Sequence, residues 1–546
     1  MTKLTTPQEV RYRWVNGLEV ALLDTREEGP YADAHPLFAV TVPVSEVETK
    51  LPALVPRQSV PIVVYDNGEG YAGRAVSRIV ALGYTDVSVL AGGLAGYSGV
   101  GELYRDVNSA SKAFGELVEA IRGTPSLPPE EIRELILNKS KQDLVVLDTR
   151  RFEEYNTMSI PRGRSCPGGE LLYRVFEAAP SPDTTVVVHC AGRTRSLIGT
   201  QSLINAGIPN KVVALRDGTI GWTLANLPPL DTGKTERVPT PSDEAVRRAR
   251  EHATSWAEHV GVPVVNNDEL LSFVAEQDKR TLYLLDVRDP EEYARGHPAR
   301  FVSAPGGQLV QATDEWIGVR GARVLLYDTD GVRARMTATW LLQMGWDVYV
   351  LDHEAKIPTT LPPPTWTPAV PSSLSSTTWS ITVHGLKTLL ADGAVVVDLA
   401  RSPAYRKEHI PGAWHTSGPE LVRDLQTEAV TNTTGPIVLT SPDGLVARAN
   451  VDEARKAIVS SSREILYLEG GTAAWVKAGQ PLETGEANAR WLSPPIDVYK
   501  RPYEGTGNDR AAMEGYIEWE HRLVAQLAND GVVGFHVVQD RREHVP

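Results

Sequence analysis

A chain of 546 residues is too long for one hydrophobic core, since single cores stop growing near about 250–300 residues, so several domains are expected. The composition is that of a globular protein, with no apolar run near the ~20 residues that span a bilayer and no secretory signal at the N-terminus. The net charge of −14 argues against a nucleic-acid binder, and two cysteines, Cys166 and Cys190, favour a reducing, cytoplasmic setting over a disulfide framework.

Four segments of the chain share one pattern. Each begins with an apolar run that ends in aspartate, has a tyrosine seven residues later, and continues to a second apolar run. The aspartates are Asp24, Asp148, Asp286 and Asp398, the tyrosines are Tyr31, Tyr155, Tyr293 and Tyr405, and the second runs cover residues 62–66, 186–190, 324–328 and 437–441. The spacing from the aspartate to the end of the second run is 42 residues in three segments and 43 in the fourth. This regularity predicts four copies of one structural unit.

The apolar runs are continuous, as is typical of strands that are buried on both faces of a parallel sheet. Helical stretches follow them, and we expect one over residues 196–206. Gly83, Gly207 and Gly345 each stand 17 residues beyond a second run, where a glycine fits a left-handed helix terminus. The sequence therefore predicts four α/β domains, each a parallel sheet flanked by helices.

The domain boundaries follow from linkers. We expect domains over residues 5–105, 126–228, 262–356 and 378–484, followed by a C-terminal extension over 485–546. A proline-rich stretch at 125–129, a charged helix at about 242–259 and a Pro/Ser/Thr-rich piece at 358–376 separate the domains. In the extension, residues 509–529 are expected to form a helix that packs on a neighbouring element.

The segment after the second apolar run carries the chemistry that we expect in the second repeat. A cysteine between a strand and a helix lies where backbone N–H groups and the helix dipole favour the thiolate. Two arginines add fixed positive charge and forked donors for an oxyanion, a glycine lets the loop bend, and a serine can cap the helix or donate its hydroxyl. The candidate residues on these grounds are Cys190 as nucleophile, with Gly192, Arg193, Arg195 and Ser196 around it.

The alternative is that Cys190 is a small buried hydrophobe, as free cysteines often are. The other three repeats argue for chemistry, because they lack the cysteine, contain a carboxylate in the equivalent loop and have alanine where the second has Ser196. Nucleophilic roles for Asp66, Asp328 or Ser441 lack an activating partner in the sequence. We expect those three domains to be scaffold or docking surface.

At this point the sequence resembles the rhodanese family. Residues 286–293 resemble the family's Asp-Val-Arg…Glu-Glu-Tyr motif, 409–413 its His-Ile-Pro-Gly-Ala motif, 167–171 its Pro-Gly-Gly-Glu-Leu piece, and 470–475 its Gly-Gly-x-x-x-Trp ending. The resemblance extends to about residue 484. There are three departures from the family pattern. The first repeat lacks the His-Ile-Pro-Gly-Ala motif and has residues 34–37, Ala-His-Pro-Leu, instead; the third lacks the Gly-Gly-x-x-x-Trp ending; and the fourth has Ala400 at the arginine position of the first motif, with Arg401 one residue later.

The resemblance implies a sulfurtransferase with four rhodanese-like domains, of which only the second is active. Cys190 is then the residue that becomes a persulfide, and residues 191–196 bind the substrate. The implied donor is thiosulfate or a related anion, and the implied acceptor is cyanide or a thiol. We expect no cofactor, no metal, no nucleic acid and no membrane partner.

Two other functions remain open. A related Cys-loop phosphatase would have arginine at position 196, but the chain has Ser196, with Arg195 one residue earlier. A sulfur carrier or scaffold would hand the Cys190 persulfide to a protein acceptor. Cys166 is a candidate second, resolving thiol, although a buried structural role is preferred, and His189 is expected to face away from Cys190 as a packing residue.

Overall fold

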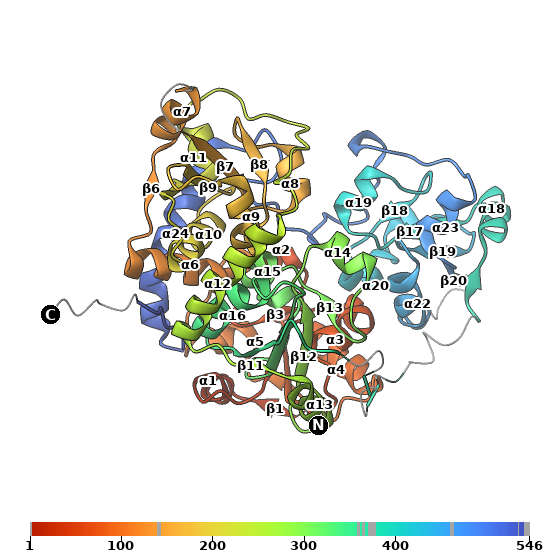
Figure 1. Cartoon of the computed structure of the whole chain (residues 1–546). Helices are drawn as coiled ribbons and strands as arrows, with labels where there is room; N and C mark the ends of the chain where they lie inside the picture. The colour runs from red at the N-terminus through yellow and green to blue at the C-terminus, as the bar shows by residue number, and fades with distance from the viewer. Residues whose placement is uncertain are drawn as a thin grey trace. The chain divides into compact units, whose positions relative to one another are not determined.

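The computed structural model describes residues 3–138, 143–357, 361–362, 366–367, 369, 378–458, 463–532 and 534–539. It confirms four α/β domains, each with a five-stranded parallel sheet and flanking helices (Figure 1). The strand order is the same in every sheet, and the second is β6-β10-β9-β7-β8. Most of the linker expected at 358–376 lies outside the described residues.

The chain divides into two compact units. One contains residues 1–10, 20–107 and 366–499, and the other contains 11–19, 108–365 and 500–546. The first and fourth domains therefore share one unit. The second and third domains share the other unit with the C-terminal extension, and Cys190 belongs to this unit.

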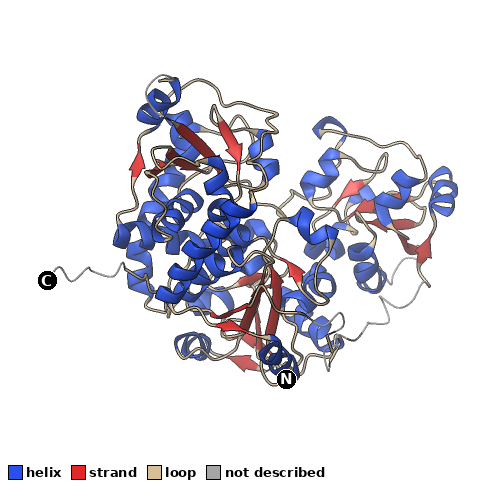
Figure 2. Ribbon diagram, viewed as in Figure 1, coloured by secondary structure: helices blue, strands red, loops and turns tan. Residues whose placement is uncertain are grey.

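The unit with the first and fourth domains has short, fully parallel sheets with helices packed on them (Figure 2). Its strands are β1 (Leu4–Thr5), β2 (Ala21–Asp24), β3 (Val40–Thr41), β4 (Ile62–Tyr65), β5 (Val87–Leu90), β16 (Ser380–Ile381), β17 (Val395–Asp398), β18 (Trp414–His415), β19 (Ile437–Thr440) and β20 (Ile465–Leu468). Its helices are α2 (Glu28–Asp33), α3 (Val47–Leu54), α4 (Tyr71–Ala81), α5 (Gly93–Ser98), α18 (Val383–Ala391), α19 (Ser402–Lys407), α20 (Leu421–Asp424), α21 (Glu428–Thr431), α22 (Leu445–Ala457) and α23 (Gly471–Lys477), and α1 (Pro7–Val15) precedes β2.

The unit with Cys190 repeats this plan twice. Its strands are β6 (Ser126–Leu127), β7 (Leu144–Asp148), β8 (Gly163–Ser165), β9 (Thr185–His189), β10 (Val212–Leu215), β11 (Val264–Val265), β12 (Leu282–Asp286), β13 (Val302–Ser303), β14 (Arg323–Tyr327) and β15 (Asp347–Leu351). Its helices are α6 (Ser109–Arg122), α7 (Pro129–Leu137), α8 (Phe152–Thr157), α9 (Leu171–Ala178), α10 (Thr194–Asn205), α11 (Gly218–Leu224), α12 (Asp243–Val260), α13 (Asn267–Ala275), α14 (Pro290–Arg295), α15 (Gly306–Gln311), α16 (Arg333–Gln343) and α24 (Arg510–Asp530).

The apolar runs form strands because both of their faces are covered. On one face of the second sheet, Leu147 and Val188 pack in a core that includes residues of α9 and α12. On the other face, Val146 and Val187 pack in a core with Trp222 of α11. This burial on both sides explains why the strands read as continuous apolar runs and not as an alternating pattern.

The repeated aspartate and tyrosine have structural roles that recur around the chain. Each tyrosine hydroxyl donates a hydrogen bond to the carbonyl eight residues later, as from Tyr155 to Gly163 at 3.0 Å and from Tyr405 to Ala413 at 2.7 Å. Where an arginine follows two residues after the aspartate, the two side chains form a buried ion pair, as in Arg150 with Asp148. These contacts fix the chain that follows the first long strand of each domain.

The predicted helices are present with small shifts at their ends. Helix α10 begins at Thr194, two residues before the expected start, and α24 covers the helix expected in the extension. Gly83, Gly207 and Gly345 have φ values of +96°, +71° and +76°, which confirms their left-handed conformation. The sequence did not predict α6, which fills the gap left between the first two domains. Among the described residues, no helix has both the length and the apolar character that crossing a membrane requires.

Candidate active site

The Cys190 loop, residues 190–196, connects the carboxyl end of β9 to α10. His189 pairs with Asp148 across the sheet, so Cys190 lies at the edge where open α/β sheets bind ligands. Cys190 is buried, with 1% exposed, and its thiol donates to the Ser196 hydroxyl at 3.4 Å. The Ser196 hydroxyl donates to the Arg193 carbonyl at 2.8 Å. Two roles are expected for Ser196. The structure confirms that its hydroxyl donates a hydrogen bond, but the prediction that Ser196 caps the helix was wrong, because α10 already begins at Thr194.

Helix α11 fixes the loop from its other side. The N–H groups of Thr219 and Ile220 donate to the carbonyls of Cys190 and Ala191, each at 3.0 Å. Gly218 has φ +57°, and a Cβ there would collide with the backbone of the loop. Glycine at Gly218, the first residue of α11, is therefore required for this close approach.

Arg193 is held by three carboxylates. Its guanidinium donates to both oxygens of Glu116 on α6, at 2.8 and 3.0 Å, to Asp217 at 3.0 Å, and also to Glu119. Only 5% of the side chain is exposed. Burial disfavours its charge, but these carboxylates outweigh burial and raise the pKa of Arg193 above its usual range. The donors of Arg193 are thus committed to α6 and to the start of α11.

Arg195 is held by one carboxylate and faces a cavity. Its guanidinium forms a two-pronged ion pair with Glu154 of α8, at 2.7 and 2.9 Å. Burial disfavours the Arg195 charge, but Glu154 and then Cys190 outweigh it and raise the pKa of Arg195 above its usual range. Of the two arginines in the loop, Arg195 has fewer carboxylate partners than Arg193.

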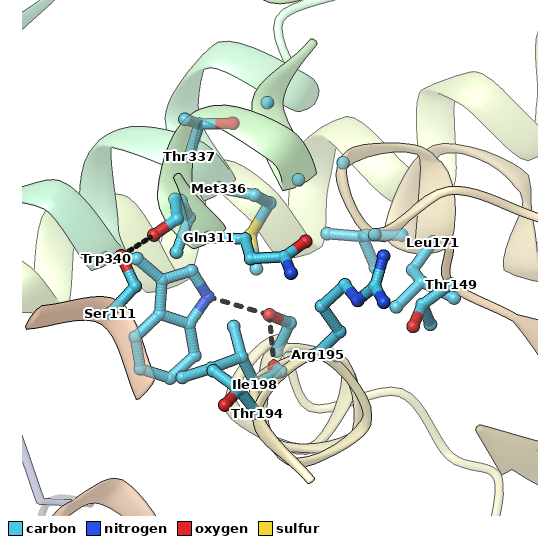
Figure 3. A pocket seen from close by; sticks show the side chains of 18 residues that line it. Ser111, Thr149, Leu171, Thr194, Arg195, Ile198, Gln311, Met336, Thr337 and Trp340 are labelled. Atoms are coloured by element: carbon cyan, nitrogen blue, oxygen red, sulfur yellow. Dashed lines mark hydrogen bonds between the residues drawn. The ribbon is translucent and has the colours of Figure 1, made fainter. Parts of the chain in front are cut away.

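The cavity beside Arg195 has a volume of about 40 Å³ and walls from the second and third domains. Figure 3 shows the Arg195 guanidinium and the Gln311 amide extending into the same space, with Met336 and Trp340 nearby. The Trp340 indole donates to the Ser202 hydroxyl of α10 at 2.7 Å, which connects the third domain to the helix that follows the Cys190 loop. The third domain lacks the cysteine but contributes to the surroundings of the Cys190 loop.

Two helices from outside the repeats cover the loop. A Cβ at Gly115 of α6 would lie 2.8 Å from the Thr194 methyl, so glycine lets α6 contact the loop directly. A Cβ at Gly192 would lie 3.2 Å from the Tyr516 ring and 3.3 Å from a Glu520 carboxyl oxygen, both on α24. Neither contact could be predicted from the sequence, because these helices do not belong to the repeated unit.

The equivalent loops of the first, third and fourth domains, which we call the sibling loops, begin with a polar side chain where the second domain has Cys190: Asp66, Asp328 and Ser441. Asp66 accepts the N–H of Ala72 at 2.9 Å, and Asp328 accepts the N–H of Ala334 at 2.8 Å, six residues onward in both loops. The Ser441 hydroxyl accepts from the N–H of Ala447 at 3.3 Å in the same way. In these three loops the N–H six residues onward therefore donates to the side chain that opens the loop, and in two of the domains that side chain is a carboxylate.

His189 lies behind the loop, as the strand geometry predicts. It is fully buried, with its Nε2 3.5 Å from a carboxyl oxygen of Asp148 and 3.4 Å from the Ser159 hydroxyl. Burial lowers the pKa of His189 to about 4 despite the Asp148 charge. A neutral imidazole against the aspartate fits a packing role.

Cys166 is part of the core of the second domain. It is fully buried among residues that include Leu147 and Leu171, and its N–H donates to the Asp148 carbonyl at 2.8 Å. Burial raises the pKa of the Cys166 thiol to about 12. Both cysteines are free thiols. This environment suits a structural residue, since the thiolate is the reactive form.

One partner of the loop repeats in the chain. Glu154 belongs to the Glu-Glu-Tyr motif, and its counterpart Glu292 pairs with Arg333 in the third domain, at the position equivalent to Arg195. This repetition is a signal that the sequence carries. The carboxylates around Arg193 and the α24 residues leave no comparable trace.

The comparisons with known proteins agree with this geometry. The family model for the rhodanese-like domain matches residues 6–99, 129–225, 267–353 and 382–478. A thiosulfate sulfurtransferase from Pseudomonas aeruginosa, known from its crystal structure, is similar with 48% identity and a TM-score of 0.91, over 98% of this chain and 100% of that one.

Other similarities are partial. The Alr3790 protein from Anabaena sp. is 25% identical over 19% of this chain and 83% of its own, with a TM-score of 0.17. No curated protein matches the chain. The four family matches cover more than half of the chain, one on each of the four sheets, and the chain belongs to the rhodanese family.

Proposed function

We propose that this protein is a sulfurtransferase that moves a sulfane sulfur from thiosulfate, or a related anionic donor, to cyanide or a thiol through a persulfide on Cys190. The similar protein from Pseudomonas aeruginosa is a thiosulfate sulfurtransferase, and the similarity runs along nearly the whole chain. The two free cysteines fit a reducing, cytoplasmic setting.

The observation that carries the proposal is the pair of carboxylates in the sibling loops. Asp66 and Asp328 accept loop N–H groups at the position where the second domain has Cys190. A loop that stabilises a carboxylate there supports a thiolate or a persulfide in the second domain. The chain has only one cysteine at this position in its four domains, so a single domain would carry the sulfur.

The reaction has two steps. The Cys190 thiolate attacks the outer sulfur of thiosulfate, the sulfur–sulfur bond of the donor breaks, and sulfite leaves with the electron pair. Cyanide then attacks the outer sulfur of the Cys190 persulfide, and thiocyanate and the Cys190 thiolate form. Charge balances in both steps, and no oxidant or cofactor is needed. This is covalent catalysis with an activated nucleophile.

The two arginines of the loop have different roles in this proposal. Arg195 faces the cavity and has Glu154 as its carboxylate partner, so we assign the oxyanion of the donor to Arg195. Arg193, held by three carboxylates, fixes the loop to α6 and α11 and acts on the donor mainly through loop geometry. Ala191, Gly192, Thr194 and Ser196 contribute backbone and hydroxyl groups to the anion-binding loop, residues 190–196, which we call the cradle.

Arg195→Leu is expected to lower kcat/KM for thiosulfate by roughly 10–100-fold, the loss of one charge-assisted contact to the donor. Arg195→Lys keeps the charge and should recover part of the loss, mainly in KM. Steady-state thiocyanate formation measures both variants. Equal kcat/KM in wild type and Arg195→Leu would contradict the assignment.

The donor is tested by turnover of thiosulfate against mercaptopyruvate at matched concentrations. The cationic cradle predicts a higher kcat/KM for thiosulfate. A clear preference for mercaptopyruvate would overturn this choice of donor and leave the Cys190 persulfide in place.

Cys166→Ala is expected to keep full sulfur transfer, because the buried thiol lies in the core and its raised pKa keeps it protonated. The variant should lose some stability, about 1 kcal/mol, since a small group leaves a packed core. Turnover and thermal melting measure the two effects separately. A large loss of turnover without a change in melting would make Cys166 a participant.

A further inference from the structure

The C-terminal helix α24 places a carboxylic acid against the Cys190 loop. Glu520 has 1% of its surface exposed, and one of its oxygens lies where the Cβ of a side chain at Gly192 would meet it, at 3.3 Å. Its other oxygen accepts a hydrogen bond from the Tyr516 hydroxyl at 2.9 Å. Gly192 is therefore the residue that lets α24 approach the catalytic loop.

One oxygen of Glu520 is unsatisfied. The Oε2 atom, the one facing Gly192, is buried and has no hydrogen-bond partner among the described residues. A buried carboxylate with an unpaired oxygen is costly, whereas a neutral acid is much less so. Because this oxygen faces the backbone of Gly192 and accepts no hydrogen bond from a cationic side chain of the described residues, the site favours the neutral form of Glu520.

The charges around Glu520 are mixed. Lys112 of α6 lies within 5.2 Å of the Tyr516 ring centre and within 5.5 Å of the Trp519 ring centre. Arg193 is already neutralised by its own carboxylates. Four ionisable groups act directly on Glu520: Tyr516 on α24, Lys112 and Glu116 on α6, and Arg193 in the loop. Two further carboxylates, Glu119 on α6 and Asp217 before α11, pair with Arg193.

We propose that Glu520 is a positioning residue for sulfur transfer, which as a neutral acid keeps α24 on Gly192 without adding negative charge beside the loop that must hold anions. This inference rests on the proposed function. Ionised Glu520 would oppose both an anionic donor and a Cys190 persulfide. The C-terminal extension then tunes the charge of the catalytic loop, beyond packing on a neighbouring element.

The direction of the pH dependence follows. Burial, and then the charge of Glu116, raise the pKa of Glu520 to about 8, while Lys112, Tyr516 and Arg193 oppose this rise. Below that pH Glu520 is neutral, and above it a negative charge is present at the loop. The kcat/KM for thiosulfate should therefore fall as the pH rises through about 8. Glu116 also has a raised pKa from burial, but its ion pair with Arg193 opposes that rise.

The test compares full-length wild type with Glu520→Gln and, as a matched control on the same helix, Glu518→Gln, whose side chain is exposed and paired with Arg522. Between pH values of about 7 and about 9.5, kcat/KM for thiosulfate should fall roughly tenfold in wild type and in Glu518→Gln. In Glu520→Gln the decline should be absent. A decline of the same size in Glu520→Gln would overturn the proposal.

A second readout does not require sulfur transfer. The rate of Cys190 alkylation by iodoacetate, divided by the rate with neutral iodoacetamide, cancels the thiolate fraction and reports local charge. This ratio should fall above about pH 8 in wild type and stay level in Glu520→Gln. If thiosulfate is not turned over but the ratio behaves in this way, the proposed function fails and the role of Glu520 in the charge of the loop stands.

A second variant, Tyr516→Phe, keeps the proposal testable if Glu520→Gln does not fold. Loss of the hydroxyl donor removes a contact that favours the ionised form of Glu520. The alkaline decline in kcat/KM and in the alkylation ratio should then move to higher pH. An unchanged midpoint in Tyr516→Phe would contradict the proposal even if Glu520→Gln were unstable.

Discussion

Cys190→Ser is expected to lower thiosulfate turnover by on the order of 10⁴-fold or more while the protein stays folded. A serine hydroxyl cannot accept the sulfur to form a persulfide, and its proton is not lost near neutral pH. The fourth domain already has Ser441 at this position, where its oxygen accepts the N–H of Ala447. The thermal melting curve of the variant should therefore match that of wild type, and thiocyanate formation measures the loss.

Cys190→Asp is the matched control for the shape and charge of the loop. Asp66 and Asp328 fill the same position and accept loop N–H groups in two sibling domains. The variant should fold and be inactive. Turnover that survives in either Cys190 variant at more than a few per cent of wild type would place the reactive sulfur elsewhere, with Cys166 the remaining thiol.

Arg150→Ala is expected to destabilise the second domain by about 3–5 kcal/mol at neutral pH, because it leaves a buried carboxylate without its charge partner. Arg150 is 1% exposed and donates to both oxygens of Asp148, at 2.9 and 2.7 Å. Burial alone would raise the pKa of Asp148, but Arg150, His189 and Ser159 outweigh burial and hold this pKa well below its usual range. Thermal melting of the full chain, with thiosulfate turnover as a second signal for this domain, measures the loss.

The fourth domain shows what the aspartate does without an arginine. Ala400 stands at the arginine position, and burial raises the pKa of Asp398 to about 6. We expect Asp148 to approach this behaviour in Arg150→Ala. Its carboxyl would then bind a proton more tightly in the folded than in the unfolded state, so the variant should lose stability as the pH rises from about 4 to about 6.

In wild type, the Arg150–Asp148 pair makes stability change with pH in the opposite direction. A depressed folded-state pKa contributes stability above about pH 4 that is lost only at lower pH. The difference in melting temperature between wild type and Arg150→Ala should thus be smaller near pH 4 than above about pH 6, where it is largest, and it should narrow further as the pH falls below about 4 and wild type loses its own contribution. Arg151→Ala removes the adjacent, half-exposed arginine and should cost less than about 1 kcal/mol. Equal losses for the two variants would contradict the argument.

The repeated unit is the part of the fold that could be predicted from the sequence. Continuous apolar runs at a constant spacing require strands that are covered on both faces, and the four parallel sheets confirm them. The position of Cys190 at a strand end followed from the same pattern. The start of α10 was misjudged by two residues, because the loop tightens through Ser196 within the first turn of the helix and no side chain caps it.

The surroundings of the loop could not be predicted in the same way. Glu116 is 77 residues from Arg193, on a helix between two repeats, and Glu520 lies on a helix after all four. Neither position is repeated, so nothing in the sequence relates it to the loop. The composition of the two units was equally hidden, because four similar domains give no sequence signal for which of them pack together.

The central claim is that Cys190 carries the sulfur, and the intact mass of the protein before and after thiosulfate tests it most directly. Wild type and Cys166→Ala should each gain about 32 Da, the mass of one sulfur atom, and lose it on addition of cyanide, while Cys190→Ser gains nothing. No gain in wild type, with the Cys190 thiol shown to be free and reactive, would contradict the account and favour a different donor or a Cys-loop phosphatase.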